Sequence, residues 1–234
     1  MPDLRPVKIR DKTPVVYPDW RWRLLDSLRE KALLLLQALD EIEEKPLVVG
    51  SVARGDVNSS SDIDIFFKGY VPSWRIALAL EKVGVAVQAY RIVQATSQTA
   101  LRFIAVVEDK VEISVPMSRL RRTEEEFPNY AGAITIHHII NKLRVRGINK
   151  QLLFIEPTCY GHDEWSIIGR EEESAKLLGI SIETILERKS MREKRAREGR
   201  TGFLFNIEIS GEESPEEFVC SLARKNPILR ETIR

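Results

Sequence analysis

Several features that mark other protein classes are scarce in this sequence. Its 234 residues include only two cysteines, Cys159 and Cys220, too few for a disulfide framework and consistent with a reducing compartment. The longest unbroken apolar runs, such as Ala32–Leu36 and Phe103–Val107, are five residues long, so no membrane span is expected. The N-terminus has no apolar signal core, and the chain has no internal repeat. Together these absences predict a cytoplasmic protein with no membrane partner.

Net charge is almost absent as well. Lys and Arg number 36 against 35 Asp and Glu, which leaves a formal charge of +1. No field of the whole protein therefore favours nucleic acid, and any such surface must be local. What is present is 43% apolar and 30% charged residues, typical of a globular protein large enough for one large or two small domains.

The chain is organised around one stretch, Leu47–Phe67, which reads LVVGSVARGDVNSSSDIDIFF. Its second apolar run carries Asp62 and Asp64, which project from the same face of a strand because successive side chains alternate. These carboxylates lie about 6–7 Å apart along the strand and repel each other, a penalty that a divalent cation removes. Mg²⁺ takes oxygen ligands and is held by one or two carboxylates plus substrate phosphates. The alternative for the pair taken alone is a surface strand with solvated acids.

The first half of this stretch favours phosphate binding. Gly50 lets a backbone approach closely, and Ser51 offers a hydroxyl and a cap for a helix expected to begin at Val52. Unpaired amides at such a helix start attract phosphate oxygens, and Arg54 adds a positive charge one turn later. The spacing predicts a strand, a phosphate-binding turn, a loop and a strand with metal ligands.

These residues carry a family resemblance. Gly50-Ser51-x-x-Arg54-Gly55 followed by Ser61-Asp62-Ile63-Asp64 resembles the signature of the polymerase-β-type nucleotidyltransferase superfamily, which adds a third carboxylate on a later strand. The segment Val111–Pro116 (VEISVP) resembles the third-carboxylate strand of archaeal CCA-adding enzymes, which likewise follows a hairpin and ends in Val-Pro. Those enzymes usually carry Asp where this chain has Glu112, so the resemblance predicts that Glu112 is the third carboxylate.

Two further features concern the nucleotide and the acceptor. Thr135 and His138, at a helix expected to open at Ala133, have the spacing of a Thr and a His that contact the triphosphate in CCA-adding enzymes. The run Arg188–Arg200 has seven basic residues against two acidic ones and continues a helix-turn-helix-like pattern, which predicts a surface for a phosphate backbone. A solvated helix face is the alternative. The expected acceptor-binding residues are Arg188, Lys189, Arg192, Lys194 and Arg195.

The pattern of elements predicts an α+β fold. We expect an extended N-terminal arm over 1–18, a nucleotidyltransferase domain with a mixed or antiparallel sheet flanked by helices over 19–130, and a C-terminal α/β domain over 131–234. Apolar residues at three- and four-residue spacing predict a helix from Asp19. Other helices are expected at Ser73–Gly84 and Pro215–Leu222, and strands at Val85–Val93, Ala100–Val107, Val111–Val115, Leu152–Ile155 and Thr201–Ile209.

The resemblance implies an enzyme that moves a nucleoside monophosphate from an NTP, expected to be ATP, to an acceptor hydroxyl and releases pyrophosphate. Asp62, Asp64 and Glu112 would be catalytic and would hold two Mg²⁺ ions, with Mn²⁺ as a substitute. The nucleotide would be bound by Gly50, Ser51, Arg54, Thr135 and His138.

Three acceptor hypotheses remain open at this point. The leading one is RNA of a tRNA-like kind, favoured by the CCA-like strand and the basic run. The second is a partner protein, because Gly50–Asp56 (GSVARGD) resembles the motif of antitoxin-type nucleotidyltransferases. Small-molecule acceptors are a further alternative within this second hypothesis. The third reading, of another class, is a nucleic-acid-binding regulator with an inactive nucleotidyltransferase core.

Overall fold

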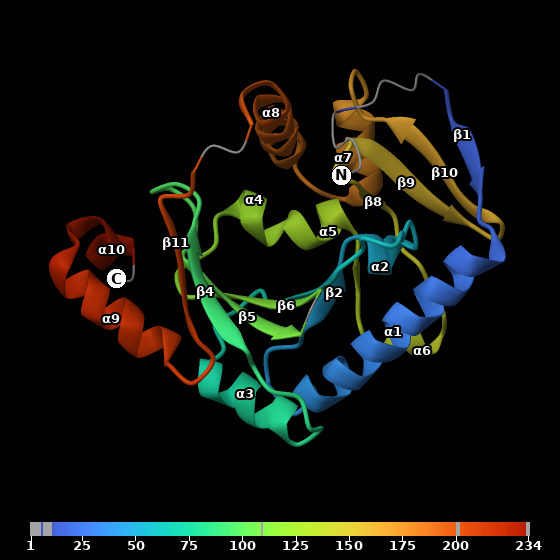
Figure 1. Cartoon of the computed structure of the whole chain (residues 1–234). Coiled ribbons are helices and arrows are strands. Elements are labelled where there is room, and N and C mark those ends of the chain that lie inside the picture. The colour runs from blue at the N-terminus through green and yellow to red at the C-terminus, as the bar shows by residue number, and fades with distance from the viewer. Residues whose placement is uncertain (1–5, 7–10, 109, 200–201, 233–234) are drawn as a thin grey trace. The chain divides into compact units, whose positions relative to one another are not determined.

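The computed structural model describes residues 6, 11–108, 110–199 and 202–232 (Figure 1). The chain divides into two compact units. The first unit comprises residues 1–30, 48–61 and 122–201, and the second comprises residues 31–47, 62–121 and 202–234. Each unit is thus assembled from three separate stretches of chain. The fold is mixed α+β, as the sequence predicts.

Helix α1, Asp19–Leu39, begins where the periodicity places it. Its apolar residues recur every three or four positions, so they form one stripe along the helix. Leu25, Ala32, Leu35, Leu36 and Leu39 of this stripe are buried. No described helix is long and apolar enough to cross a membrane.

The second unit is built on a sheet in the order β11-β4-β5-β6-β3. The strands are β3 Ile63–Phe66, β4 Ala89–Gln94, β5 Arg102–Glu108, β6 Val111–Pro116 and β11 Phe205–Ser210. All neighbours are antiparallel except β3 and β6, which run parallel. The expected strands are therefore present with bounds shifted by a few residues. Asp109, in the turn expected between β5 and β6, and Thr201 lie outside the described residues.

One face of this sheet is apolar and covered. Ile63, Ile113 and Phe103 are almost fully buried, and the Tyr90 ring packs edge-on against Phe103 at 5.7 Å. Helices α3, Ser73–Glu81, and α9, Pro215–Lys225, begin beside each other, because Glu216 accepts hydrogen bonds from the backbone amide and hydroxyl of Ser73 at 2.8 and 2.6 Å. Both Ser73 and Glu216 interact with Tyr90 on this face of the sheet. Burial raises the pKa of Tyr90 to about 12, with the charge of Glu216 adding to the effect.

The opposite face of the sheet carries alternate side chains that are half-exposed, among them Asp64, Glu112, Arg91 and Arg102. We call it the open face.

The first unit has a separate sheet in the order β1-β10-β9-β8, with β1 Thr13–Val16, β10 Gly161–Ser166, β9 Leu153–Thr158 and β8 Gly147–Ile148. Its β1 pairs antiparallel with β10, so part of the expected N-terminal arm is a sheet strand. The strand expected at Leu152–Ile155 corresponds to β9. Strand β2, Leu47–Val49, pairs with β7, Ala133–Ile134, in this unit through Val48 and Val49. Its helices include α4 Arg122–Glu125, α5 Phe127–Ala131, α7 Glu171–Leu178 and α8 Ile182–Glu198.

The start of α8 is fixed by the carboxylate of Glu126, which lies between α4 and α5. Glu126 Oε2 accepts hydrogen bonds from the Ser181 backbone at 2.9 Å and from the Ser181 and Thr184 hydroxyls at 2.5 Å each. Partial burial by itself raises the pKa of Glu126, but the hydrogen bonds from Ser181 and Thr184 outweigh it and lower the pKa to about 2.

This geometry predicts a pH-dependent contribution to stability. Because the folded pKa of Glu126 lies below its ordinary value of 4.5, its stabilising effect is fully present above pH 4.5 and is lost as the pH falls towards 2. In urea unfolding between pH 7 and pH 2, the native chain should exceed Glu126→Gln in unfolding free energy at neutral pH. The difference should shrink below about pH 4.5. A difference that stays constant over this range would contradict the assignment.

Candidate functional site

The structure brings two of the three predicted carboxylates side by side. Asp64 on β3 and Glu112 on β6 are directly paired in the parallel register. Neighbouring strands lie about 4.8 Å apart, and residues opposite each other in a parallel pair point to the same face. Both side chains are half-exposed on the open face. Asp62 lies one residue before β3 and two before Asp64, so strand alternation directs it to that face as well.

Glu112 has a cationic partner on the same face. Arg91, from β4, donates through Nη2 to Glu112 Oε1 at 2.6 Å. The exposed fractions of the two side chains are 31% and 37%. Arg91 was not among the residues predicted from the sequence. Arginines are common at alternating positions of strands, so Arg91 does not stand out in the sequence. Its contact with Glu112 depends on the strand order, which the sequence does not state.

The three carboxylates suit a divalent cation, because they offer the right kind of donor atom and because the strand register sets Asp64 beside Glu112. All three offer hard oxygen ligands, and the pairing of Asp64 with Glu112 concentrates negative charge at one point. In the described part of the chain, however, no group of three or more His, Cys, Asp or Glu side chains is arranged to hold a metal ion. One Glu112 oxygen accepts a hydrogen bond from Arg91.

In the first unit, the turn Gly50–Gly55, which we call the phosphate turn, has a backbone that requires glycine. Gly50 has φ 84° and ψ −143°, and Gly55 has φ 100°, conformations that L side chains rarely adopt. Between them α2 spans Ser51–Arg54, and the Gly55 amide donates to the Ser51 carbonyl at 2.7 Å.

Ser51 is placed differently from the expectation. It is the first residue of α2, while Gly50 occupies the cap position and no side chain caps the helix. The Ser51 hydroxyl instead donates to Ser61 Oγ at 3.2 Å, and Ser61 Oγ also accepts from the Asn58 amide at 2.9 Å. Two hydroxyls therefore meet at the beginning of the phosphate turn, and sequence reasoning did not identify Ser61 as one of them.

Arg54 is also placed differently. Its side chain is buried, and it donates to the Ala131 carbonyl at 2.5 Å and to Asp56 Oδ2 at 2.9 Å. Gly132 is required beside it, because a Cβ at Gly132 would lie 2.7 Å from Arg54 Cγ. The expectation of an arginine directed at phosphate is therefore replaced by one that ties α2 to the last residue of α5.

Thr135 and His138 pair with each other. The helix α6 spans Ile136–Ile140 rather than opening at Ala133, and Thr135 is its cap. Thr135 Oγ1 and His138 Nδ1 lie 2.9 Å apart, and the two residues form a capping box. Because Ala133 pairs with Val49 in an antiparallel register, the chain carries Thr135 away from Ser51, by on the order of 10 Å. The contact of Thr135 and His138 with the triphosphate stays a prediction.

The basic run lies on α8 and divides into two parts. Near the start, Arg188 stacks over the Phe127 ring at 4.6 Å, and Lys189 pairs with Glu171 at 2.5 Å. Arg192 also belongs to this part. Burial raises the pKa of Tyr130 to about 12, and the positive charge of Arg192 opposes this rise. Lys194, Arg195 and Arg197 form the second part and are exposed. Arg200 lies outside the described residues.

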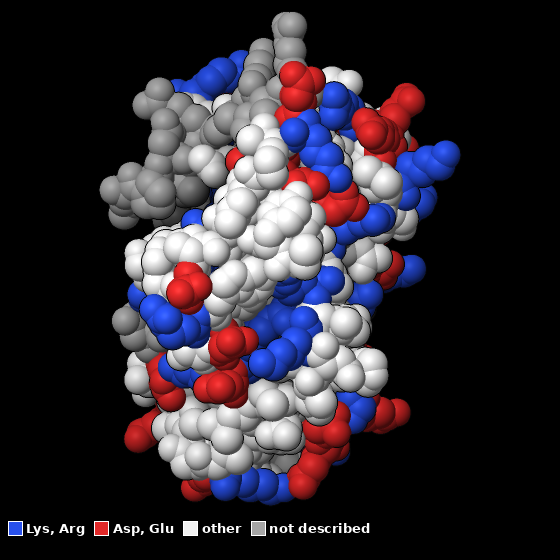
Figure 2. Space-filling model, turned by 90° about the vertical axis from the view of Figure 1, so that its right-hand side faces the viewer, with Lys and Arg blue, Asp and Glu red and all other residues white. Residues whose placement is uncertain are grey.

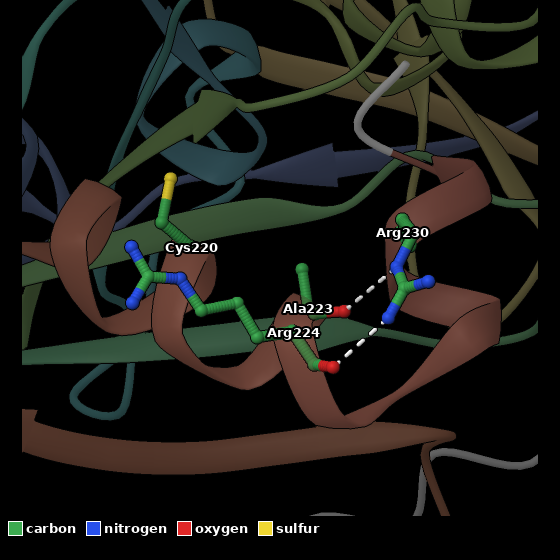
Figure 3. Close-up of a pocket in the computed structure, with 4 residues that line it drawn as sticks. All are labelled: Cys220, Ala223, Arg224 and Arg230. Atoms are coloured by element: carbon green, nitrogen blue, oxygen red, sulfur yellow. Dashed lines mark hydrogen bonds between the residues drawn. The ribbon is translucent and has the colours of Figure 1, made fainter.

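The face shown in Figure 2 carries both basic and acidic side chains, with several basic ones gathered near its centre. On α9 and α10, Pro227–Thr232, a pocket is lined by Cys220, Ala223, Arg224 and Arg230 (Figure 3). Arg230 donates to the Ala223 and Arg224 carbonyls at 3.3 and 2.9 Å. None of the predicted site residues lines this pocket.

Comparison with known proteins identifies one match. Residues 29–143 match a family model described as a nucleotidyltransferase domain. This range contains the phosphate turn, the three carboxylates and the Thr135–His138 pair. A search of curated proteins and a search of solved structures each found no match.

Proposed function

The chain carries a nucleotidyltransferase domain of the polymerase-β-type superfamily over residues 29–143, and from this we propose a metal-dependent transfer of a nucleoside monophosphate to RNA. The donor would be an NTP, with ATP as the expected one, and pyrophosphate would be released. The observation that carries the proposal is the direct pairing of Asp64 with Glu112 on the open face, with Asp62 two residues before Asp64.

Each residue has a distinct role in this proposal. Asp62, Asp64 and Glu112 would hold Mg²⁺, whose chemistry is to lower the pKa of the attacking hydroxyl and to neutralise charge on the leaving pyrophosphate. The Ser51 hydroxyl would bind phosphate oxygens of the NTP, supported by Ser61. The predicted role of the Gly50 amide is replaced by a structural one, because this amide donates to the Gly132 carbonyl at 2.9 Å. Arg54 holds the phosphate turn in shape through Asp56 and Ala131.

The choice of RNA as acceptor rests on α8. Its residues Lys194, Arg195 and Arg197 are basic and exposed, and they provide a local positive surface of the kind that contacts a phosphate backbone. Arg188 and Lys189 are used in packing against Phe127 and Glu171, so the contact surface is the C-terminal half of the helix.

The test is incubation of the full chain with each NTP labelled at the α-phosphate, Mg²⁺, total RNA and lysate protein. Label is expected in RNA, and the same NTP labelled at the γ-phosphate should give none there. The triple variant Lys194→Gln, Arg195→Gln, Arg197→Gln should raise the apparent KM for RNA, with the difference from the native chain shrinking at higher salt because the variant makes fewer phosphate contacts. The matched control Arg224→Gln on α9 should leave KM unchanged.

The outcomes separate the acceptor hypotheses. Label in protein would favour the antitoxin-like reading, and label in small molecules would favour a metabolite acceptor. Absence of label from every class, with retained RNA binding, would point to a regulator with an inactive core and would overturn the enzyme proposal.

A further inference from the structure

The Arg91–Glu112 contact spans two strand spacings of the open face. Arg91 on β4 is paired with Ile104 on β5, and Ile104 is paired with Ser114 on β6. Arg91 therefore lies level with Ser114, and its side chain extends diagonally across β5 to reach Glu112. The extra methylene that distinguishes Glu from Asp brings the carboxylate within this reach.

A second carboxylate lies on the other side of Arg91. Glu208 on β11 is its direct antiparallel partner, and Glu208 is exposed. Cβ atoms of such cross-strand partners are about 4.5–5.5 Å apart, so opposite charges at these positions can pair. Arg91 thus stands between two acids, Glu112 towards the centre of the sheet and Glu208 at its edge strand.

We propose that Arg91 is a positioning residue that alternates between these two acids and thereby controls access of a divalent cation to Glu112. In the metal-free protein Arg91 holds Glu112, as observed, and when a cation takes Glu112 the guanidinium moves to Glu208. This inference rests on the proposed function, which makes Glu112 a metal ligand.

The physical basis is competition for one carboxylate. A guanidinium and a divalent cation both require the Glu112 oxygens, and their like charges repel, so binding of one opposes binding of the other. Ion pairs between partly exposed side chains are weak, so exchanging Glu112 for Glu208 costs Arg91 little. Without a second acid, the released charge would face the metal uncompensated.

Arg102 provides a matched control on the same face. It donates to Ser114 Oγ at 3.0 Å, and its guanidinium lies over the Phe66 ring at 4.4 Å. Arg102→Gln removes the same charge from the same face while the Arg91–Glu112 contact remains.

The test measures Mn²⁺ affinity of the nucleotide-free full chain by electron paramagnetic resonance, which requires no activity. Arg91→Gln should bind Mn²⁺ about 3- to 10-fold more tightly than the native chain. Glu208→Gln should bind about 2-fold more weakly, because Arg91 then has only Glu112. In the Arg91→Gln background Glu208→Gln should have no effect, and in the Glu112→Gln background Arg91→Gln should give no tightening.

Several outcomes would overturn the inference. Unchanged or weaker binding by Arg91→Gln would show that Arg91 does not compete with the metal. If Arg102→Gln tightened Mn²⁺ binding as much as Arg91→Gln, the effect would come from the loss of any positive charge on this face. If Glu208→Gln still weakened Mn²⁺ binding in the Arg91→Gln background, movement of Arg91 between the two acids would be excluded. These failures are separable from failure of the proposed function, because the native chain would still transfer label from an NTP. Absence of Mn²⁺ binding in all variants together with absence of transfer would overturn both.

Discussion

Asp64→Asn is expected to reduce nucleotidyl transfer by at least on the order of 1,000-fold, which corresponds to about 4 kcal/mol of transition-state stabilisation. The amide keeps the shape of the side chain but loses the charge that a divalent cation requires, at the position paired with Glu112. The measurement is the rate of pyrophosphate release with saturating NTP and Mg²⁺. Asp62→Asn and Glu112→Gln should show losses of similar order.

The control for this prediction is Glu108, a carboxylate on the same β5–β6 hairpin as Glu112. Glu108 at the end of β5 pairs with Lys31 at 2.5 Å, so Glu108→Gln should leave the transfer rate within a factor of about two. RNA binding by Glu112→Gln should be retained, since the acceptor surface is assigned to α8. If Asp62→Asn and Glu112→Gln both kept the native rate, the enzyme proposal would be wrong.

Arg54→Ala is expected to lower the free energy of unfolding by about 3–5 kcal/mol. The buried guanidinium is bound by Asp56 and by the Ala131 carbonyl, and its removal leaves the largely buried Asp56 carboxylate without its cation. The measurement is urea unfolding followed by circular dichroism. If Arg54 bound phosphate and had no structural role, Arg54→Ala would instead leave the stability unchanged and raise the KM for NTP.

A second variant keeps this prediction testable if Arg54→Ala fails to fold. Asp56→Asn retains the guanidinium and its bond to Ala131, so it should cost less than Arg54→Ala. The double variant Arg54→Ala, Asp56→Asn should recover part of the loss, because the unpaired carboxylate is then absent. A double variant with fully additive losses would show that the two side chains do not act as a pair.

Local patterns in the sequence were sufficient for elements whose signals are short-range. The stripe of leucines predicts α1, and the alternation of apolar residues predicts β4, β5 and β6 to within a few residues. Pro215 and the apolar spacing after it predict α9. In each case the signal lies within one element, because backbone periodicity directly sets which side chains share a face.

Shifts at element ends had local causes that pattern reading did not resolve. Ser51 was expected as a helix cap, but it is the first residue of its helix and its hydroxyl hydrogen-bonds elsewhere, to Ser61. Thr135 caps a helix that starts three residues later than expected, since β7 occupies Ala133–Ile134. A hydroxyl near a helix start satisfies the same sequence pattern whether it caps the helix or bonds to a distant partner.

By itself, then, the sequence carried the signal of a nucleotidyltransferase domain, which the family match over residues 29–143 supports, and it predicted that Asp62 and Asp64 share a face, because both depend on residues close together in the chain. Only the tertiary structure decided what depends on pairing between distant segments. The parallel register of β3 and β6 sets Asp64 beside Glu112. The positions of β4 and β11 give Glu112 a cationic partner in Arg91 and set Glu208 opposite Arg91. The contacts of Arg54 with Ala131 likewise depend on a segment 77 residues away. Register and strand order follow from how whole apolar faces pack, and no single motif encodes them.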